Sequence, residues 1–177
     1  MNSVASKIRK HLRPLIGLRL SITRRAADLR NFQFGEVRTV ERGTVGEYAL
    51  HIQCPWRLEG QGGIITGRSD LWEPDTEAAS SQRPGWTYED GNLQDERLGF
   101  LLKGYDPQTR SLVNETDHFV VEDIEADACG GAIITLSGGY RLVLFPAGTQ
   151  GESWRFFRPG DKAGHFVVED GAVSSHV

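Results

Sequence analysis

The sequence predicts a mainly β fold of the β-rich α+β class: an antiparallel sheet, sandwich or open barrel of roughly nine short strands. Three observations support this prediction. Apolar and polar residues alternate with period two over many short segments of the 177-residue chain, as in strands with one buried face. Turns rich in Gly and Asp separate these segments. Helical spacing of apolar residues predicts an N-terminal short helix and one mid-chain helix near 93–103.

The N-terminal helix is predicted from three apolar residues spaced by four, which share one helical stripe: Val4, Ile8 and Leu12. Pro14 ends this helix, because proline has no backbone N–H to donate. All seven Lys and Arg side chains of residues 1–27 precede the first acid, Asp28. Residues 1–14 therefore form a basic N-terminal helix or arm.

Two strands and a short helical segment are expected next. Residues 16–23 alternate between apolar and polar, which predicts a strand whose buried face carries Ile16, Leu18, Leu20 and Ile22. Residues 24–31 can form one or two helical turns. Phe32 and Phe34 share a face and begin a second strand.

The longest alternation covers residues 47–59 and predicts a single strand. Its apolar face carries six residues: Tyr48, Leu50, Ile52, Cys54, Trp56 and Leu58. Pro55 cannot donate to a ladder, so this part is an edge or a bulge. A Gly-rich turn then leads into a hairpin strand over 64–72.

A long polar loop and a helix fill the middle of the chain. Residues 73–92 hold Pro, Ser, Gly and acidic residues, and a loop of this length is usually functional or disordered. Asn92 is a good N-cap for the helix near 93–103. Period-two segments then predict further strands at 118–127, 131–137, 140–146, 152–158 and 164–169.

The composition indicates one ordinary globular domain over residues 1–177. Hydrophobic residues make up 38% of the chain, which excludes disorder over its whole length. With only two cysteines, Cys54 and Cys129, a reduced cytoplasmic protein is expected. No apolar run reaches the length of about 18 residues that a membrane span needs.

Charge is divided unevenly along the chain. Residues 1–42 carry a net charge of +7, and residues 43–177 carry −11. A basic arm on an acidic body could contact nucleic acid or anionic lipid, or lie against its own acidic body or that of a second copy. We expect neutralisation by an acidic body and regard nucleic-acid binding as the minor alternative, because the sequence pI is only 5.7.

Motifs for catalysis, metal binding or cofactor binding do not appear. His51 and Cys54 lie three apart in a predicted strand and so point to opposite faces, which excludes joint chelation of a metal. The Gly-rich segment 60–63 leads into a strand and lacks the Lys-Ser/Thr ending of a phosphate loop. We therefore expect no catalytic residue, no bound metal and no cofactor.

One acidic row keeps an enzymatic alternative open. Asp123, Glu125 and Asp127 alternate along a predicted strand and would line one of its faces. Such a row can bind a divalent cation or supply a carboxylate pair for hydrolysis. It is also the usual appearance of a solvated or edge-protecting strand face, which we favour.

Aromatic residues around the long loop are the remaining candidates for binding. Trp72, Trp86 and Tyr88 lie in or beside the loop, and Arg68 lies nearby in the sequence. Exposed aromatic and Arg side chains are typical of recognition surfaces. The sequence therefore predicts a non-catalytic module that binds a protein partner, a second copy of itself or a small ligand. One version is an acidic protein that neutralises a basic partner.

Overall fold

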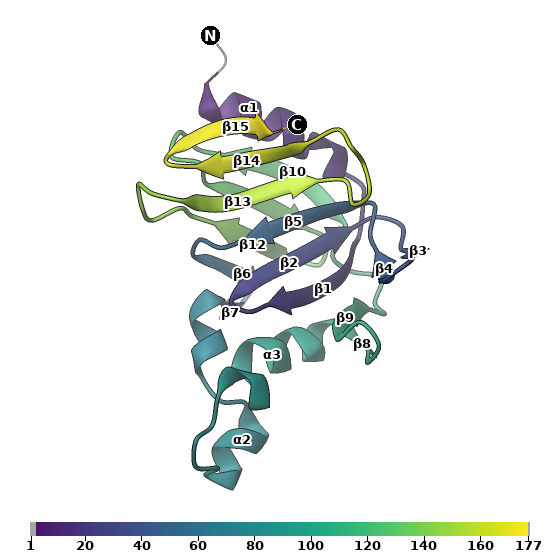
Figure 1. Ribbon diagram of the computed structural model, residues 1–177, viewed down its shortest axis with the longest axis vertical. Coiled ribbons are helices and arrows are strands. Elements are labelled where there is room, and N and C mark those ends of the chain that lie inside the picture. Colours follow the sequence, from purple (N-terminus) through teal and green to yellow (C-terminus); the bar gives the residue numbers. More distant parts are fainter. Residues whose placement is uncertain (1–2, 177) are drawn as a thin grey trace.

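The computed structural model describes residues 3–176, which form two antiparallel sheets packed face to face (Figure 1). The eight-stranded sheet contains, in spatial order, β15 (Ala172–His176), β14 (His165–Glu169), β13 (Glu152–Phe157), β5 (Tyr48–Ile52), β2 (Leu29–Phe34), β1 (Leu20–Ala26), β9 (Ser111–Asn114) and β8 (Lys103–Asp106). The five-stranded sheet contains β10 (Val121–Ala126), β11 (Ala132–Leu136), β12 (Tyr140–Leu144), β6 (Trp56–Gly60) and β7 (Gly63–Gly67). A separate hairpin joins β3 (Arg38–Val40) to β4 (Gly43–Val45).

Helices lie at the two ends of the sandwich (Figure 1). At one end is α1 (Val4–Leu12), whose Ile8 and Leu12 enter the common core, followed by the 3-10 turn η1 (Arg13–Leu15). At the other end are η2 (Arg68–Trp72), α2 (Thr76–Ser81), η3 (Tyr88–Asp90) and α3 (Leu93–Leu102). The core is formed by the facing apolar residues of both sheets together with α1 and α3.

The predicted fold class is confirmed. The structure is mainly β with antiparallel sheets, an N-terminal helix and a helix at Leu93–Leu102 that begins after the N-cap Asn92. The expected number of strands was too low, because the described chain contains fifteen. Short pairs such as β3–β4 and β8–β9 carry little apolar alternation, so sequence periodicity does not reveal them.

The expectation of helical turns at 24–31 is wrong. These residues form the end of β1 and the start of β2, joined at Ala27, whose φ is +54°. The pairing of Arg30 with Ile52 on β5 extends the segment into the large sheet. Helix propensity is a weak preference, and cross-strand pairing overrides it here.

The first strand begins later than predicted. Leu20 opens β1, whereas Ile16 lies in a turn and is 47% exposed. A register shift between Leu20 and Ile22 then pairs Ile22 with Gln33, while Thr23 pairs with the core residue Phe32. The bulge therefore moves Ile22 to the sheet face opposite Phe32, which a strict alternation does not foresee, although Ile22 is buried there as predicted.

The single strand predicted over 47–59 is two strands in different sheets. β5 belongs to the large sheet and β6 to the small one, and the chain crosses between them at Gln53, Cys54 and Pro55. The predicted buried residues are nevertheless in the core, from Leu50 to Leu58. Both sheets face the same interior, so the alternation continues across the break.

The predicted loop at 73–92 is only partly a loop, since it contains α2 and the turn η3. Likewise, the strand predicted over 64–72 ends at Gly67 and continues as η2. None of the helices in residues 3–176 combines the length and apolar character that crossing a bilayer requires.

Candidate functional site

A pocket opens where β9 separates from β1. β9 pairs with β1 only at Ile22 and Thr23, whereas β1 stays paired with β2 as far as Ala26. The end of β1 therefore has no neighbour on its β9 side. The hollow measures about 440 Å³, and we call it the arginine pocket after its four cations: Arg24, Arg25, Arg30 and Arg110.

The charge of the arginine pocket is opposite to that of the whole chain. Two carboxylates, Glu89 and Asp95, line it beside the four arginines, which leaves a net charge of +2. The chain as a whole carries −4. A concave site of one charge sign attracts ligands of the other sign.

Arg30 is the most buried cation of this pocket. Its side chain is 1% exposed and points toward the N-terminal turn of α3. Nε donates to Thr23 Oγ1 at 2.8 Å, and Nη1 donates to Gln94 Oε1 at 3.2 Å and to Asp95 Oδ1 at 2.5 Å. Nη2 is buried and has no hydrogen-bond partner among residues 3–176. A buried charged donor without a partner is costly and marks a place where a ligand oxygen would be stabilised.

Asp95 connects two of the arginines to α3. The Asp95 carboxylate also accepts a hydrogen bond from Arg25 Nε at 2.9 Å. At the N-cap, the Asn92 side-chain amide donates to this carboxylate, and the Asn92 side-chain oxygen accepts from the Asp95 backbone N–H. Burial by itself would raise the pKa of Asp95, but the charge and hydrogen bonds of Arg30, aided by Asn92 and Arg25, lower it overall. Asp95 is therefore ionised at neutral pH and keeps both arginines in place.

The other two arginines have no such partner. Within the described part of the chain, no carboxylate lies at ion-pair distance from Arg24 or Arg110. Arg24 Nη2 donates to the Thr44 carbonyl at 2.5 Å, and its buried Nε has no partner. Burial lowers the pKa of Arg24, and the nearby charge of Asp106 opposes that shift. Unpaired positive charge therefore remains in the pocket.

Two of the residues predicted to bind form an aromatic rim beside this pocket, Trp72 and Tyr88. Their rings meet edge to face with centroids 5.1 Å apart, and Trp72 is 50% exposed. The Arg25 guanidinium lies 5.3 Å from the centroid of the Tyr88 ring. A cation over an aromatic face is attractive. Arg25 thus joins the aromatic rim to the arginine pocket.

The remaining two predicted residues have structural partners. Arg68 donates to Asp28 at 2.8 Å, which ties η2 to the turn between β1 and β2. Trp86 is half-buried, and its Nε1 donates to the Gly91 carbonyl at 2.9 Å, which anchors the loop before α3. None of the four arginines was predicted to bind a ligand, because residues 24–31 were expected to form one or two helical turns and Arg110 belongs to no recognisable motif.

No protein family, curated protein or solved structure matches this chain. The choice among its candidate sites therefore depends on the geometry of the chain itself.

The acidic row considered for hydrolysis is divided by the structure. Asp123 and Glu125 are exposed on β10, an edge strand of the small sheet. β10 ends at Ala126, and Asp127 instead accepts hydrogen bonds from the backbone N–H groups of Cys129 and Gly131. Among residues 3–176, no group of three His, Cys, Asp or Glu side chains could hold a metal ion.

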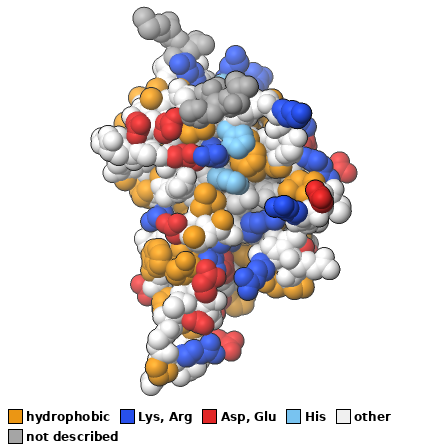
Figure 2. Space-filling model, in the orientation of Figure 1, with side chains coloured by type: hydrophobic (Ala, Val, Ile, Leu, Met, Phe, Trp, Pro, Cys, Tyr) orange, Lys and Arg blue, Asp and Glu red, His pale blue; other side chains and the backbone are white. Residues whose placement is uncertain are grey.

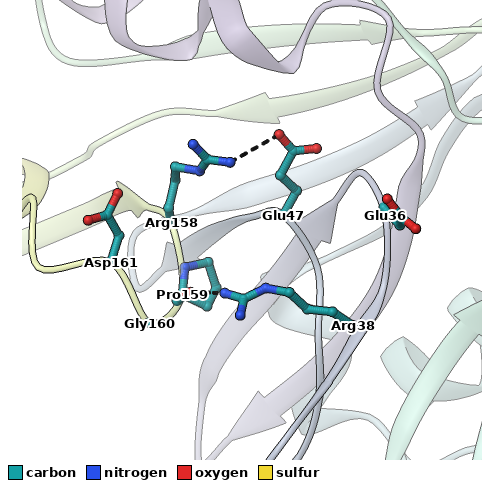
Figure 3. Close-up of a pocket in the computed structure, with 7 residues that line it drawn as sticks. All are labelled: Glu36, Arg38, Glu47, Arg158, Pro159, Gly160 and Asp161. Atoms are coloured by element: carbon teal, nitrogen blue, oxygen red, sulfur yellow. Dashed lines mark hydrogen bonds and ion pairs between the residues drawn. The ribbon is translucent and has the colours of Figure 1, made fainter.

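A wider hollow of about 580 Å³ lies between the segment after β2 and the loop after β13 (Figure 3). Figure 3 shows Arg158 directed at Glu47, with a distance of 3.3 Å between Nη2 and Oε1. Arg38 donates to the Pro159 carbonyl on the opposite wall. Neither arginine has a buried nitrogen without a partner among the described residues, whereas Arg24 Nε and Arg30 Nη2 of the arginine pocket do, so the arginine pocket is the stronger candidate site.

The positive charge of residues 1–42 is only partly neutralised by ion pairs with the body. Arg25 and Arg30, which lie outside the basic arm at residues 1–14, have such ion pairs. The side chains of α1 and η1 behave differently, because Lys7, Arg9, Lys10 and Arg13 are exposed. None of these four has an ion pair within the range that the structure describes.

His51 occupies the outer face of the large sheet, opposite the core residues of β5. Its cross-strand neighbours are Asn31 and Arg155, and its ring meets the Phe157 ring edge to face. Histidine side chains are visible on this face in Figure 2. Burial lowers the pKa of His51 to about 4, and the charges of Arg155 and His165 add to the shift.

This shift predicts a loss of stability on mild acidification. The folded protein keeps His51 neutral down to a pKa of about 4, whereas the unfolded chain protonates it below about 6.5. Unfolding therefore takes up a proton, and the contribution of His51 to stability falls as the pH drops through this window. Because the ring is partly solvent-exposed, we expect a loss of about 1–2 kcal/mol.

Urea unfolding near neutral pH and near pH 5 tests this prediction. His51→Gln should remove the pH dependence between these conditions, since ordinary carboxylates titrate at lower pH. The same substitution at the exposed His118 serves as a control and should leave the pH dependence of the unfolding free energy unchanged. A His51→Gln protein with the wild-type pH dependence would contradict the assignment.

Proposed function

We propose that this chain is a non-catalytic binding module that holds an anionic group of a ligand or partner in the arginine pocket. The observation that carries the proposal is Arg30, a buried arginine whose Nη2 lacks a hydrogen-bond partner in a pocket of net positive charge. The unpaired Arg24 and Arg110 support it.

This proposal narrows the functions suggested by the composition. The acidic body favours a basic partner, but the pocket has the opposite local charge. Guanidinium groups form two parallel hydrogen bonds to carboxylate or phosphate, so anions of these two kinds are the natural ligands. The aromatic rim offers an apolar surface to the part of a larger partner that lies next to the anion.

Titration of the isotope-labelled protein with succinate, citrate and inorganic phosphate, followed by amide NMR shifts, tests the proposal. We expect saturable shifts at the end of β1 and at the start of α3, and weaker binding as salt is added. Arg110→Gln should weaken the binding by about tenfold, because one charge-assisted hydrogen bond is lost.

The control is Arg9→Gln, which makes the same charge change on α1, at the far end of the sandwich (Figure 1). Arg9→Gln should keep the affinity for the anion within about twofold of that of the unsubstituted protein, a difference in binding free energy below about half a kcal/mol. If no anion shifts the amides at the end of β1, or if both variants weaken binding equally, the pocket is not a binding site.

A further inference from the structure

The two ends of the arginine pocket differ in chemistry, because one is charged and the other is apolar. Thr23 pairs with Leu112 on β9, and Leu112 pairs with Tyr105 on β8, so these three side chains form a row on one face of the sheet. All three line the pocket, and Arg30 Nε donates to the Thr23 hydroxyl at the start of the row. Cross-strand neighbours lie about 5 Å apart, so the row extends about 10 Å from Thr23 to Tyr105.

From this arrangement we propose that the ligand is a phosphate monoester that carries a flat ring, of the size of a nucleoside monophosphate. The inference rests on the proposed function and adds the chemical class of the ligand. The phosphate lies against the free Nη2 of Arg30, and the ring lies over Leu112 against Tyr105.

Charge favours a phosphate monoester over a monocarboxylate. The pocket has a net charge of +2 after its two carboxylates are counted. A phosphate monoester carries about −1.5 to −2 at neutral pH and therefore neutralises the pocket. Its terminal oxygens can accept from Arg30 Nη2 and from Arg110, which lines the same pocket and has no ion pair among the described residues.

Size and exposure indicate the ring. A hollow of about 440 Å³ falls in the usual range for small organic ligands and is wide for a bare phosphate ion. Tyr105 is 61% exposed, so its ring is accessible for stacking. Tyr88 is less suitable, because the Arg25 guanidinium lies over its ring and the Trp72 ring packs against it.

Calorimetric titration of the full chain with adenosine monophosphate, inorganic phosphate, adenosine and succinate tests the proposal. We expect the monophosphate to bind at least tenfold more tightly than inorganic phosphate, and adenosine and succinate to bind more weakly than either. The affinity for the monophosphate should fall several-fold from neutral pH to about pH 5, because the phosphate loses its second charge near pH 6. Affinity for sulfate, which does not titrate in this range, should stay constant.

Substitutions of two exposed pocket residues distinguish the binding of the ring from the binding of the phosphate. Tyr105→Ala should weaken the monophosphate by about tenfold and leave inorganic phosphate unchanged, whereas Arg110→Gln should weaken both. Phe100→Ala, at an exposed ring on α3 outside the arginine pocket, and Arg9→Gln, on α1, should change neither affinity by more than about twofold.

Each failure has a distinct meaning. If inorganic phosphate or succinate binds as tightly as the monophosphate, or if Tyr105→Ala weakens monophosphate binding no more than Phe100→Ala does, the ligand class is wrong and the anion pocket stands. If none of the anions binds, both the ligand class and the proposed function are wrong.

Discussion

Arg30→Met should lower the free energy of unfolding by about 2–3 kcal/mol in the absence of ligand. The substitution keeps most of the apolar volume of the side chain but removes the charge that faces Asp95 at 2.5 Å. Thr23 Oγ1 and Gln94 Oε1 also lose a donor. The loss lies below that of a fully buried ion pair, because Asp95 is 34% exposed and keeps its ion pair with Arg25.

A double-mutant cycle with Asp95→Asn separates the ion pair from the packing. The amide removes the uncompensated carboxylate, so the double variant should be more stable than the sum of the two single losses predicts, by about 1 kcal/mol or more. Urea unfolding of the four proteins gives the coupling directly. Additive losses would show that Arg30 and Asp95 do not interact and would remove the support that Arg30 gives to the proposed site.

Trp154→Ala should cost about 3–5 kcal/mol, the largest effect we expect from a single core substitution. Trp154 has 0% exposure and lies on β13 of the large sheet, where its ring contacts Phe166. Its Nε1 donates at 2.8 Å to the carbonyl of Gly130, in the loop between β10 and β11 of the small sheet. The substitution therefore opens a cavity and also breaks a hydrogen bond between the sheets.

The same substitution at the exposed Trp72 provides a matched control. Trp72→Ala removes a ring that is 50% exposed and should cost less than about 1 kcal/mol. Trp154→Phe should fall between the two, since it keeps a ring but loses the bond to Gly130. Thermal unfolding of the three variants checks this order, and equal losses at Trp72 and Trp154 would contradict the described core.

The alternation of residues 47–59 shows both the strength and the limit of the sequence. It identified Leu50, Ile52, Trp56 and Leu58 as core residues, and all four are buried. It could not locate the crossing between the sheets, since a residue that faces the common interior looks the same in either sheet. Only the partners of the strands, β13 for β5 and β12 for β6, distinguish the two halves.

The candidate site was less accessible to sequence reasoning than the core. Trp72 and Tyr88 were predicted to bind because exposed aromatic side chains in or beside a long polar loop are typical of recognition surfaces, and the structure brings their rings into contact. The arginines follow no motif. Arg30 and Arg110 lie on opposite sides of an opening in the sheet, and they line one pocket only because β9 leaves β1 after two paired residues.

The sequence by itself determined the local properties of this protein: the antiparallel β class, the buried face of most strands and the capped helix that begins after Asn92. These follow from periodicity and capping, which act between residues close in the chain. The tertiary structure decided the register, the division into two sheets and the arginine pocket. Each of these depends on free energies of pairing and burial between distant segments, and no local pattern records them.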